Sequence, residues 1–68
     1  MNVTVNGEPR ELRESARVPD AVAAVGAEAA GRGLAVAVDG VVVPRGEWDG
    51  FELRDGQRVE VLRAVQGG

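Results

Sequence analysis

The fold follows from the stretch LAVAVDGVVVP, residues 34–44. Over residues 34–38, large and small apolar side chains alternate, so the leucine and valines would face one side of a strand and the alanines the other. Asp39-Gly40 favours a tight turn, residues 41–43 supply a short return strand, and Pro44 ends it by removing a backbone donor. The stretch therefore predicts a β-hairpin with one face toward a core.

A second hairpin is predicted at the beginning of the chain. Residues 1–6, MNVTVN, alternate apolar and polar side chains with the period of a strand, and Asn6-Gly7 is a strong tight-turn signal. Residues 8–13 would then form a short return strand in which Leu12 is the clear inward residue.

Between the two hairpins the apolar spacing changes to that of a helix. Val18, Val22 and Val25 fall at i, i+4 and i+7, with an alanine on the same face and a proline in the first turn. The helix would end at Gly26 or, one turn later, at the Gly-Arg-Gly of residues 31–33. The sequence does not distinguish between these two C-terminal boundaries of the helix.

The bulky side chains follow the second hairpin. Residues 44–48 resemble a single helical turn, and Trp48, Phe51 and Leu53 are the only large apolar residues in a stretch rich in Gly, Asp and Arg. We expect them to fill the bottom of the core. Core filling is favoured over a base-stacking role for Trp48 because Phe51 is its only aromatic companion.

The last strand is predicted over residues 58–62, after a turn at Asp55-Gly56. Its alternation turns Val59 and Val61 inward and Leu62 outward. The element order indicates an α+β fold in which one main helix covers one face of a mixed five-stranded sheet. The other face is left open, with a modest apolar patch that includes Leu62 and the two outward alanines of residues 34–38.

Composition excludes most enzyme classes. The 68 residues include 44% hydrophobic residues, of which 13 are valines, so the chain should fold, and a single domain over residues 1–68 is expected. Cys, His and Lys are absent, and Ser15 and Thr4 are the only aliphatic hydroxyls, so side-chain nucleophilic catalysis has almost nothing to use. We expect no metal site and no bound cofactor, because thiolate and imidazole ligands and a calcium-loop motif are missing.

Charge and hydropathy bear on the partners. The net charge is −3 and no apolar run reaches the roughly 18 residues that cross a bilayer, so neither nucleic acid nor membrane is expected as a partner. The absence of cysteine and of a leader-like first segment predicts a cytoplasmic protein. We expect a monomer when it is free.

The sequence ends in Gly67-Gly68. Two glycines alone are typical of a frayed terminus. They would also suit an extended tail that threads a narrow cleft of another protein and presents a carboxylate, because glycine has no Cβ.

Four stretches resemble the ThiS family of thiamine-pathway sulfur carriers, which have a ubiquitin-like β-grasp fold. They are VTVNGE at residues 3–8, AVAVDG at 35–40, VVPRGEW at 42–48 and DGQRVEVLRAVQGG at 55–68. The resemblance spans the chain, and VPR-x-EW and AVQGG are its most specific parts. Two departures stand out: Asp39 replaces a usual Asn, and Arg17-Val18-Pro19 replaces a Ser or Thr helix cap, which would weaken the helix start by roughly 1 kcal/mol if the cap is missing.

The resemblance implies a carrier that acts as a co-substrate of other enzymes. Gly68 would be the reacting end, converted to an adenylate and then a thiocarboxylate. Gly67 would be the narrow spacer, and residues 64–68 a flexible, extended tail held by the partner through Gln66, Val65 and Ala64. The implied partners are an E1-like adenylyltransferase of the ThiF type that uses ATP and magnesium, a thiazole synthase of the ThiG type, and a sulfur donor such as a cysteine desulfurase or rhodanese-like protein.

A docking face is also implied. Leu62 and Ala37 would belong to it, by their outward phase and by resemblance to the apolar patch of ubiquitin-like proteins. Two alternatives remain: a molybdopterin-synthase small subunit, whose tail usually carries a proline that residues 63–66 lack, and a ubiquitin-like protein modifier.

Overall fold

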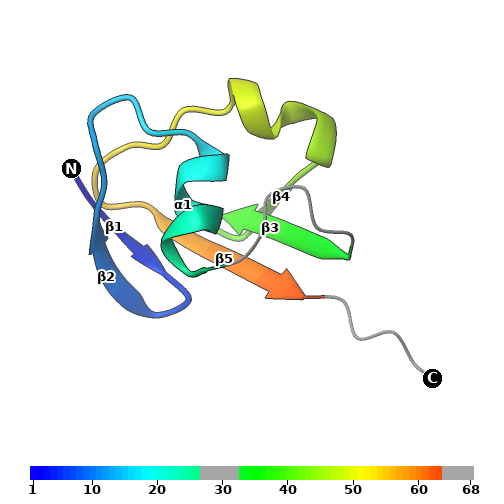
Figure 1. The fold of residues 1–68 in the computed structure, drawn as a ribbon, viewed down its shortest axis with the longest axis horizontal. Coiled ribbons are helices and arrows are strands. Elements are labelled where there is room, and N and C mark those ends of the chain that lie inside the picture. Colours follow the sequence, from blue (N-terminus) through cyan, green and yellow to red (C-terminus); the bar gives the residue numbers. More distant parts are fainter. Residues whose placement is uncertain (27–32, 64–68) are drawn as a thin grey trace.

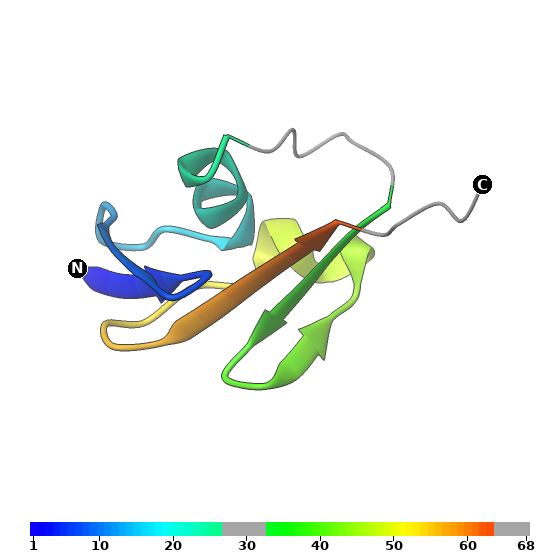
Figure 2. The ribbon, with the colours of Figure 1, turned by 90° about the horizontal axis from the view of Figure 1, so that it is seen from below.

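The computed structural model describes residues 1–26 and 33–63. The elements in chain order are β1 (Asn2–Val5), β2 (Glu8–Glu11), α1 (Val18–Ala24), β3 (Leu34–Val38), β4 (Val41–Val43), the 3-10 helix η1 (Arg45–Gly50) and β5 (Arg58–Arg63). The five strands form one sheet in the order β2-β1-β5-β3-β4, in which only β1 and β5 are parallel. Helix α1 lies on one face of this sheet, and no helix of the described residues lies on the opposite face (Figures 1 and 2). The predicted α+β architecture is confirmed.

Both predicted hairpins are present, and both have the turn geometry that their dipeptides favour. Asn6 and Gly7 have φ values of 52° and 82°, and Asp39 and Gly40 have 51° and 84°. Positive φ at both central residues matches the right-handed twist of the flanking strands. Strand β2 is shorter than predicted, so Leu12 lies just beyond it, where its side chain packs against the core.

The core is built from the inward residues of the strands and one face of α1. Its fully buried side chains are mostly valines, and none of the buried residues among those described is polar or charged. The cluster comprises Val3, Val5, Val18, Ala21, Val22, Val36, Val38, Val43, Trp48, Leu53, Val59 and Val61. The predicted phases of α1, β3 and β5 are therefore confirmed.

Trp48 closes one end of the core. It is 3% exposed, and its indole Nε1 donates a hydrogen bond to the Val43 carbonyl oxygen at 2.9 Å. Leu53 is buried in the same cluster, and Phe51 is partly buried and packs against the cluster. The core-filling interpretation is confirmed, although the predicted helical turn is a 3-10 helix that continues to Gly50.

The start of α1 differs from the expectation of a weakened cap. Arg17 occupies the cap position and its side chain caps no backbone donor, as its chemistry requires. The backbone donors of the first turn are nevertheless satisfied: the Val18 N–H bonds to the Phe51 carbonyl oxygen at 3.2 Å, and the Asp20 N–H bonds to the Arg17 carbonyl oxygen at 2.8 Å. Pro19 between them has no N–H. No donor is left for a Ser or Thr cap to satisfy at these three positions, so the predicted loss of roughly 1 kcal/mol does not follow.

The Asp20 side chain accepts a hydrogen bond from the backbone of the cap residue, Arg17. Its Oδ2 atom accepts the Arg17 backbone N–H at 2.8 Å and lies 3.3 Å from the Arg13 guanidinium. The hydrogen bond from the Arg17 backbone is the main cause of a lowered Asp20 pKa; partial burial opposes it and Arg13 adds to it. The carboxylate is thus stabilised in its charged form.

Mutation of Asp20 should reveal how much its charged carboxylate contributes to the free energy of unfolding. Because the pKa is lower in the folded state, the stabilisation is fully present above the unfolded-state value and is lost as the pH falls below about 4. We expect Asp20→Ala to lower the free energy of unfolding by about 1 kcal/mol at pH 7. Denaturant titrations should show this difference shrinking at pH 3. An unchanged difference at the two pH values would contradict a role of the carboxylate, and Asp20→Asn, which retains an acceptor, should lose less.

The end of α1 agrees with the shorter of the two predicted boundaries. Gly26 has the left-handed backbone that a helix-terminating glycine adopts, with φ of 77°, and its N–H bonds to the Ala23 carbonyl oxygen at 3.0 Å. The alternative end at residues 31–33 falls largely on residues 27–32, outside those that the structure describes.

The substitution of Asp39 for the usual Asn is compatible with the turn. Its Oδ1 atom accepts the Arg58 backbone N–H at 2.9 Å, and its Oδ2 atom accepts Gln57 Nε2 at 3.2 Å. The carboxylate therefore bonds the β3–β4 hairpin to the beginning of β5.

Candidate functional site

The predicted site has two parts, a tail and a sheet face. All five predicted tail positions, Ala64, Val65, Gln66, Gly67 and Gly68, lie outside the described residues. The last described residue before them is Arg63, where β5 ends at one side of the described fold (Figure 1).

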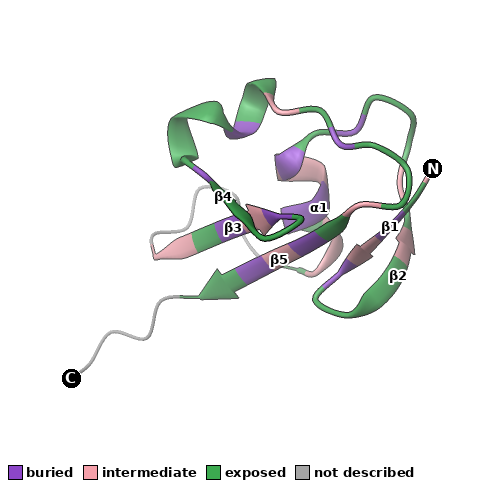
Figure 3. Ribbon diagram, turned by 180° about the vertical axis from the view of Figure 1, so that it is seen from behind, coloured by how far each residue is buried: buried purple, intermediate pink, exposed green. Residues whose placement is uncertain are grey.

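The predicted docking residues lie on the open face of the sheet. Leu62 is 58% exposed, and Ala37 is half-buried between neighbouring strands. They are diagonal neighbours, since Leu62 is opposite Ala35 and Ala37 is opposite Glu60 in the β3–β5 ladder. Figure 3, which views the molecule from behind, colours the end of β5 and most of β4 as exposed. The predicted outward phase of both residues is confirmed.

Two further apolar residues, Ala35 and Val42, lie beside Leu62 and Ala37 on this face. Val42 is opposite Ala37 in the β3–β4 ladder and is 67% exposed. We call Ala35, Ala37, Val42 and Leu62 the outer patch. Sequence reasoning missed Val42, although the signal was present: a two-residue turn at Asp39-Gly40 places residues 37 and 42 opposite each other.

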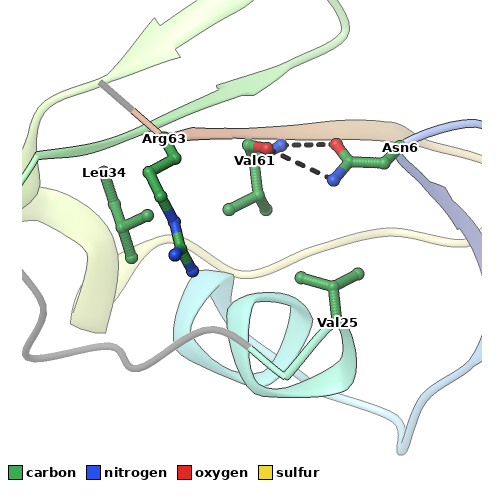
Figure 4. Close-up of a pocket in the computed structure, with 5 residues that line it drawn as sticks. All are labelled: Asn6, Val25, Leu34, Val61 and Arg63. Atoms are coloured by element: carbon green, nitrogen blue, oxygen red, sulfur yellow. Dashed lines mark hydrogen bonds between the residues drawn. The ribbon is translucent and has the colours of Figure 1, made fainter. Parts of the chain in front are cut away.

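The outer patch is bordered by charge along β5. Glu60 and Arg58 precede Leu62 on the same face of this strand, because side chains two residues apart point the same way. Arg63 lies on the other face, where Figure 4 shows its side chain extending toward α1. The apolar part of the open face is thus concentrated toward the end of β5 from which the segment 64–68 continues.

The end of β5 is held by an interaction that the sequence reasoning did not anticipate. Val61 donates its backbone N–H to Asn6 Oδ1 at 2.8 Å, and its carbonyl oxygen accepts from Asn6 Nδ2 at 3.2 Å (Figure 4). The turn residue thereby bonds both backbone groups of a strand residue. The Asn-Gly dipeptide predicted the turn but carried no signal for these bonds, which join positions 55 residues apart in the chain.

A small cavity lies beside this interaction, between the end of α1 and the sheet. Its volume is about 200 Å³ and its lining residues are Asn6, Val25, Leu34, Val61 and Arg63 (Figure 4). Among the described residues that line it, Arg63 carries the one ionisable side chain, and none of the five is a nucleophile. These five residues offer a guanidinium and an amide beside apolar groups, and they include no acid–base pair.

Within residues 1–26 and 33–63, no group of three or more Cys, His, Asp or Glu side chains is arranged to hold a metal ion. No helix of the described part of the chain is long and apolar enough to span a membrane.

Comparison with known proteins gives a consistent match. The model of the ThiS family matches residues 3–68. The crystal structure of the thiamine biosynthesis protein ThiS from Geobacter metallireducens is similar, with 34% identity over the whole of both chains and a TM-score of 0.80. An NMR structure of a thiamine biosynthesis protein from Geobacter metallireducens shares 35% identity over this whole chain and 88% of the other, with a TM-score of 0.74. The comparison with curated proteins gives no match.

Proposed function

Because the chain belongs to the ThiS family, we propose that it is a sulfur carrier of thiamine biosynthesis and that the Gly68 carboxylate is its reacting group. The observation that carries the proposal is the extent of the family match, which runs from residue 3 to residue 68 and so includes the Gly67-Gly68 end. The two similar structures support it, since both are of thiamine biosynthesis proteins.

Activation has to overcome the low reactivity of a carboxylate. An oxygen of the Gly68 carboxylate attacks the α-phosphorus of ATP on a ThiF-type adenylyltransferase, pyrophosphate leaves, and an acyl adenylate forms. This mixed anhydride has a good leaving group, whereas the carboxylate has none. ATP and magnesium belong to the activating enzyme, where the metal would neutralise the phosphate charge.

Sulfur enters at the carbonyl carbon of the adenylate. With hydrosulfide as the nucleophile, attack on this carbon displaces AMP and leaves a Gly68 thiocarboxylate. With a desulfurase or rhodanese-like donor, the terminal sulfur of its persulfide would attack the same carbon, displace AMP and form an acyl disulfide. A thiol would then attack the donor's sulfur in this disulfide, which releases the thiocarboxylate and leaves a disulfide between the thiol and the donor. The thiocarboxylate gives its sulfur to a ThiG-type thiazole synthase. The chain is thus a co-substrate of partner enzymes, which fits a sequence without Cys, His or Lys.

The tail and the outer patch have separate roles in this proposal. Gly67 is the narrow spacer, and the backbone of Gln66, Val65 and Ala64 lies in the partner's channel. The outer patch, which includes the predicted docking residues Leu62 and Ala37, contacts the body of the activating enzyme. The net charge of −3 suits a basic surface on that enzyme, which would raise the rate of encounter at low salt.

A charge in the outer patch should weaken docking. We expect Leu62→Glu to lower kcat/KM for adenylation about tenfold, mainly through KM, because an exposed Leu at the centre of an interface is replaced by a group that must be desolvated. Steady-state kinetics with the activating enzyme measures this.

The matched control is Val41→Glu. Val41 is 68% exposed, similar to Leu62, but it is opposite Val38 and therefore lies outside the outer patch. Its kinetics should change by less than about twofold. Equal losses in the two variants would argue against docking through the outer patch.

ATP–pyrophosphate exchange tests the proposed pathway against its alternatives. The chain should stimulate exchange by a ThiF-type enzyme and not by the activating enzyme of molybdopterin biosynthesis. Stimulation of only the second enzyme would favour a molybdopterin-synthase subunit. Covalent ladders on other proteins would favour a modifier.

A further inference from the structure

The parallel pairing of β1 with β5 is short. Only Thr4 with Arg58 and Val5 with Val59 are opposite each other, and the Asn6 N–H then bonds to the Val59 carbonyl oxygen at 2.9 Å. The chain turns away at Asn6, while β5 continues to Arg63. On this side, residues 60–63 of β5 extend beyond the last residue pair of the β1–β5 ladder.

Beyond the end of the β1–β5 ladder, the Asn6 side chain makes the bonds to β5 that a further residue of β1 would make. Its amide accepts the Val61 N–H at 2.8 Å and donates to the Val61 carbonyl oxygen at 3.2 Å. A neighbouring strand would satisfy both groups in this way, and an amide side chain is the group that can offer one donor and one acceptor together. Figure 4 shows the amide in line with the backbone of Val61.

On the other side, β3 supports β5 to its end, with Leu34 opposite Arg63. Val61 lies three residues before the segment 64–68 that the proposed function assigns to the partner's channel. The Asn6 amide and β3 together hold the point from which that segment leaves.

We propose that Asn6 is a positioning residue for the C-terminal segment: its amide keeps residues 61–63 ordered and aimed before the activating enzyme binds. The inference rests on the proposed function. Ordering each further backbone residue costs roughly 5- to 30-fold in an equilibrium constant, so a frayed end of β5 would bind more weakly with unchanged contacts. The effect would appear in KM and leave kcat nearly unchanged, because the reacting group is the same.

Asp39 provides an internal control. It has the same position in its turn as Asn6 and nearly the same φ, 51° against 52°. Its side chain also bonds to β5, but at Arg58, the end of the strand away from the segment 64–68. Glycine suits this backbone at both positions, so Asn6→Gly and Asp39→Gly each remove side-chain bonds to β5 without introducing backbone strain.

The experiment compares these two variants with the unmodified chain, well below their melting temperatures. Hydrogen exchange by NMR is measured at the Leu62 amide relative to Val59, and adenylation kinetics with a ThiF-type enzyme gives kcat and KM. We expect Asn6→Gly to speed exchange at Leu62 at least about tenfold and to raise KM about tenfold. Asp39→Gly should change both by less than about twofold, even where its melting temperature falls as much.

Two results would overturn the inference: equal effects of the two variants on KM and Leu62 exchange, which indicate a purely structural role, or no effect of Asn6→Gly on either. If the unmodified chain is not adenylated, the proposed function fails, and exchange at Leu62 still decides whether Asn6 orders this end of β5. Asn6→Asp is the second variant in case Asn6→Gly does not fold. It retains the acceptor for the Val61 N–H but loses the donor to the Val61 carbonyl, so its effects should be intermediate.

Discussion

Deletion of Gly68 is expected to abolish adenylation and thiocarboxylate formation while leaving the fold intact. The reacting group in the proposed mechanism is the carboxylate of this residue, and the deletion moves the chain end back by one residue, about 3.3 Å in an extended segment. The described core extends along the chain only from Val3 to Val61, so no core side chain is removed. Pyrophosphate exchange measures the loss, and thermal melting checks the fold.

Gly67→Val is the companion to this deletion. It retains the terminal carboxylate and adds a β-branched side chain where the proposal requires a narrow spacer, so activation should again fail with a normal melting temperature. If either change unfolds the protein, the view that residues 64–68 act independently of the core is wrong. If Gly67→Val is activated normally, the narrow-channel explanation for the two glycines is wrong.

Val61→Asp is expected to unfold the protein. Val61 is 8% exposed and belongs to the core cluster, opposite Val36 in the β3–β5 ladder. A carboxylate there must lose its hydration among the valines of the core, which costs more than about 4 kcal/mol. A core in a chain of this length rarely supplies more than about 3–5 kcal/mol of net stability. Circular dichroism at 25 °C should therefore show a largely unfolded chain.

Leu62→Glu is the matched control for Val61→Asp. The two positions are adjacent in β5 but face opposite sides of the sheet, and Leu62 is 58% exposed. The control should melt within a few degrees of the unmodified protein while losing docking, because exposed substitutions change stability by about 0.5 kcal/mol or less. Cooperative melting of Val61→Asp at the normal temperature would show that the assigned inward phase of β5 is inverted.

Local elements of this fold could be predicted because their signals are local. Asn6-Gly7 and Asp39-Gly40 determine two hairpins through their left-handed backbone, and alternation determines which side chains of β3 and β5 face the core. Strand order is different. Nothing in the alternation of β5 indicates that it inserts between β1 and β3, and the resemblance to a known family supplied the expected β-grasp fold.

The helix start shows how a local rule can fail. A missing Ser or Thr cap normally leaves backbone donors unsatisfied, but here one position is Pro19 and another donor, the Val18 N–H, reaches the Phe51 carbonyl oxygen. That acceptor is contributed by a segment more than 30 residues away in the chain. Only the tertiary structure could show it.

The candidate site was also predictable only where its features depend on local sequence. The outward phase of Leu62 and Ala37 followed from alternation, whereas the contribution of Val42 depended on cross-strand register. The bonds of Asn6 to Val61 depended on two segments 55 residues apart meeting in space. The predicted roles of residues 64–68 came from family resemblance, and they remain proposals.

The most direct test of the sulfur-carrier role is intact-mass spectrometry with fragmentation of the C-terminal residues. The protein is incubated with ATP, magnesium, a ThiF-type activating enzyme and a sulfur source. We expect a mass gain corresponding to exchange of one oxygen for sulfur, localised to Gly68 and absent without ATP. An unchanged Gly68, under conditions in which the same enzyme modifies a known ThiS protein, would contradict it.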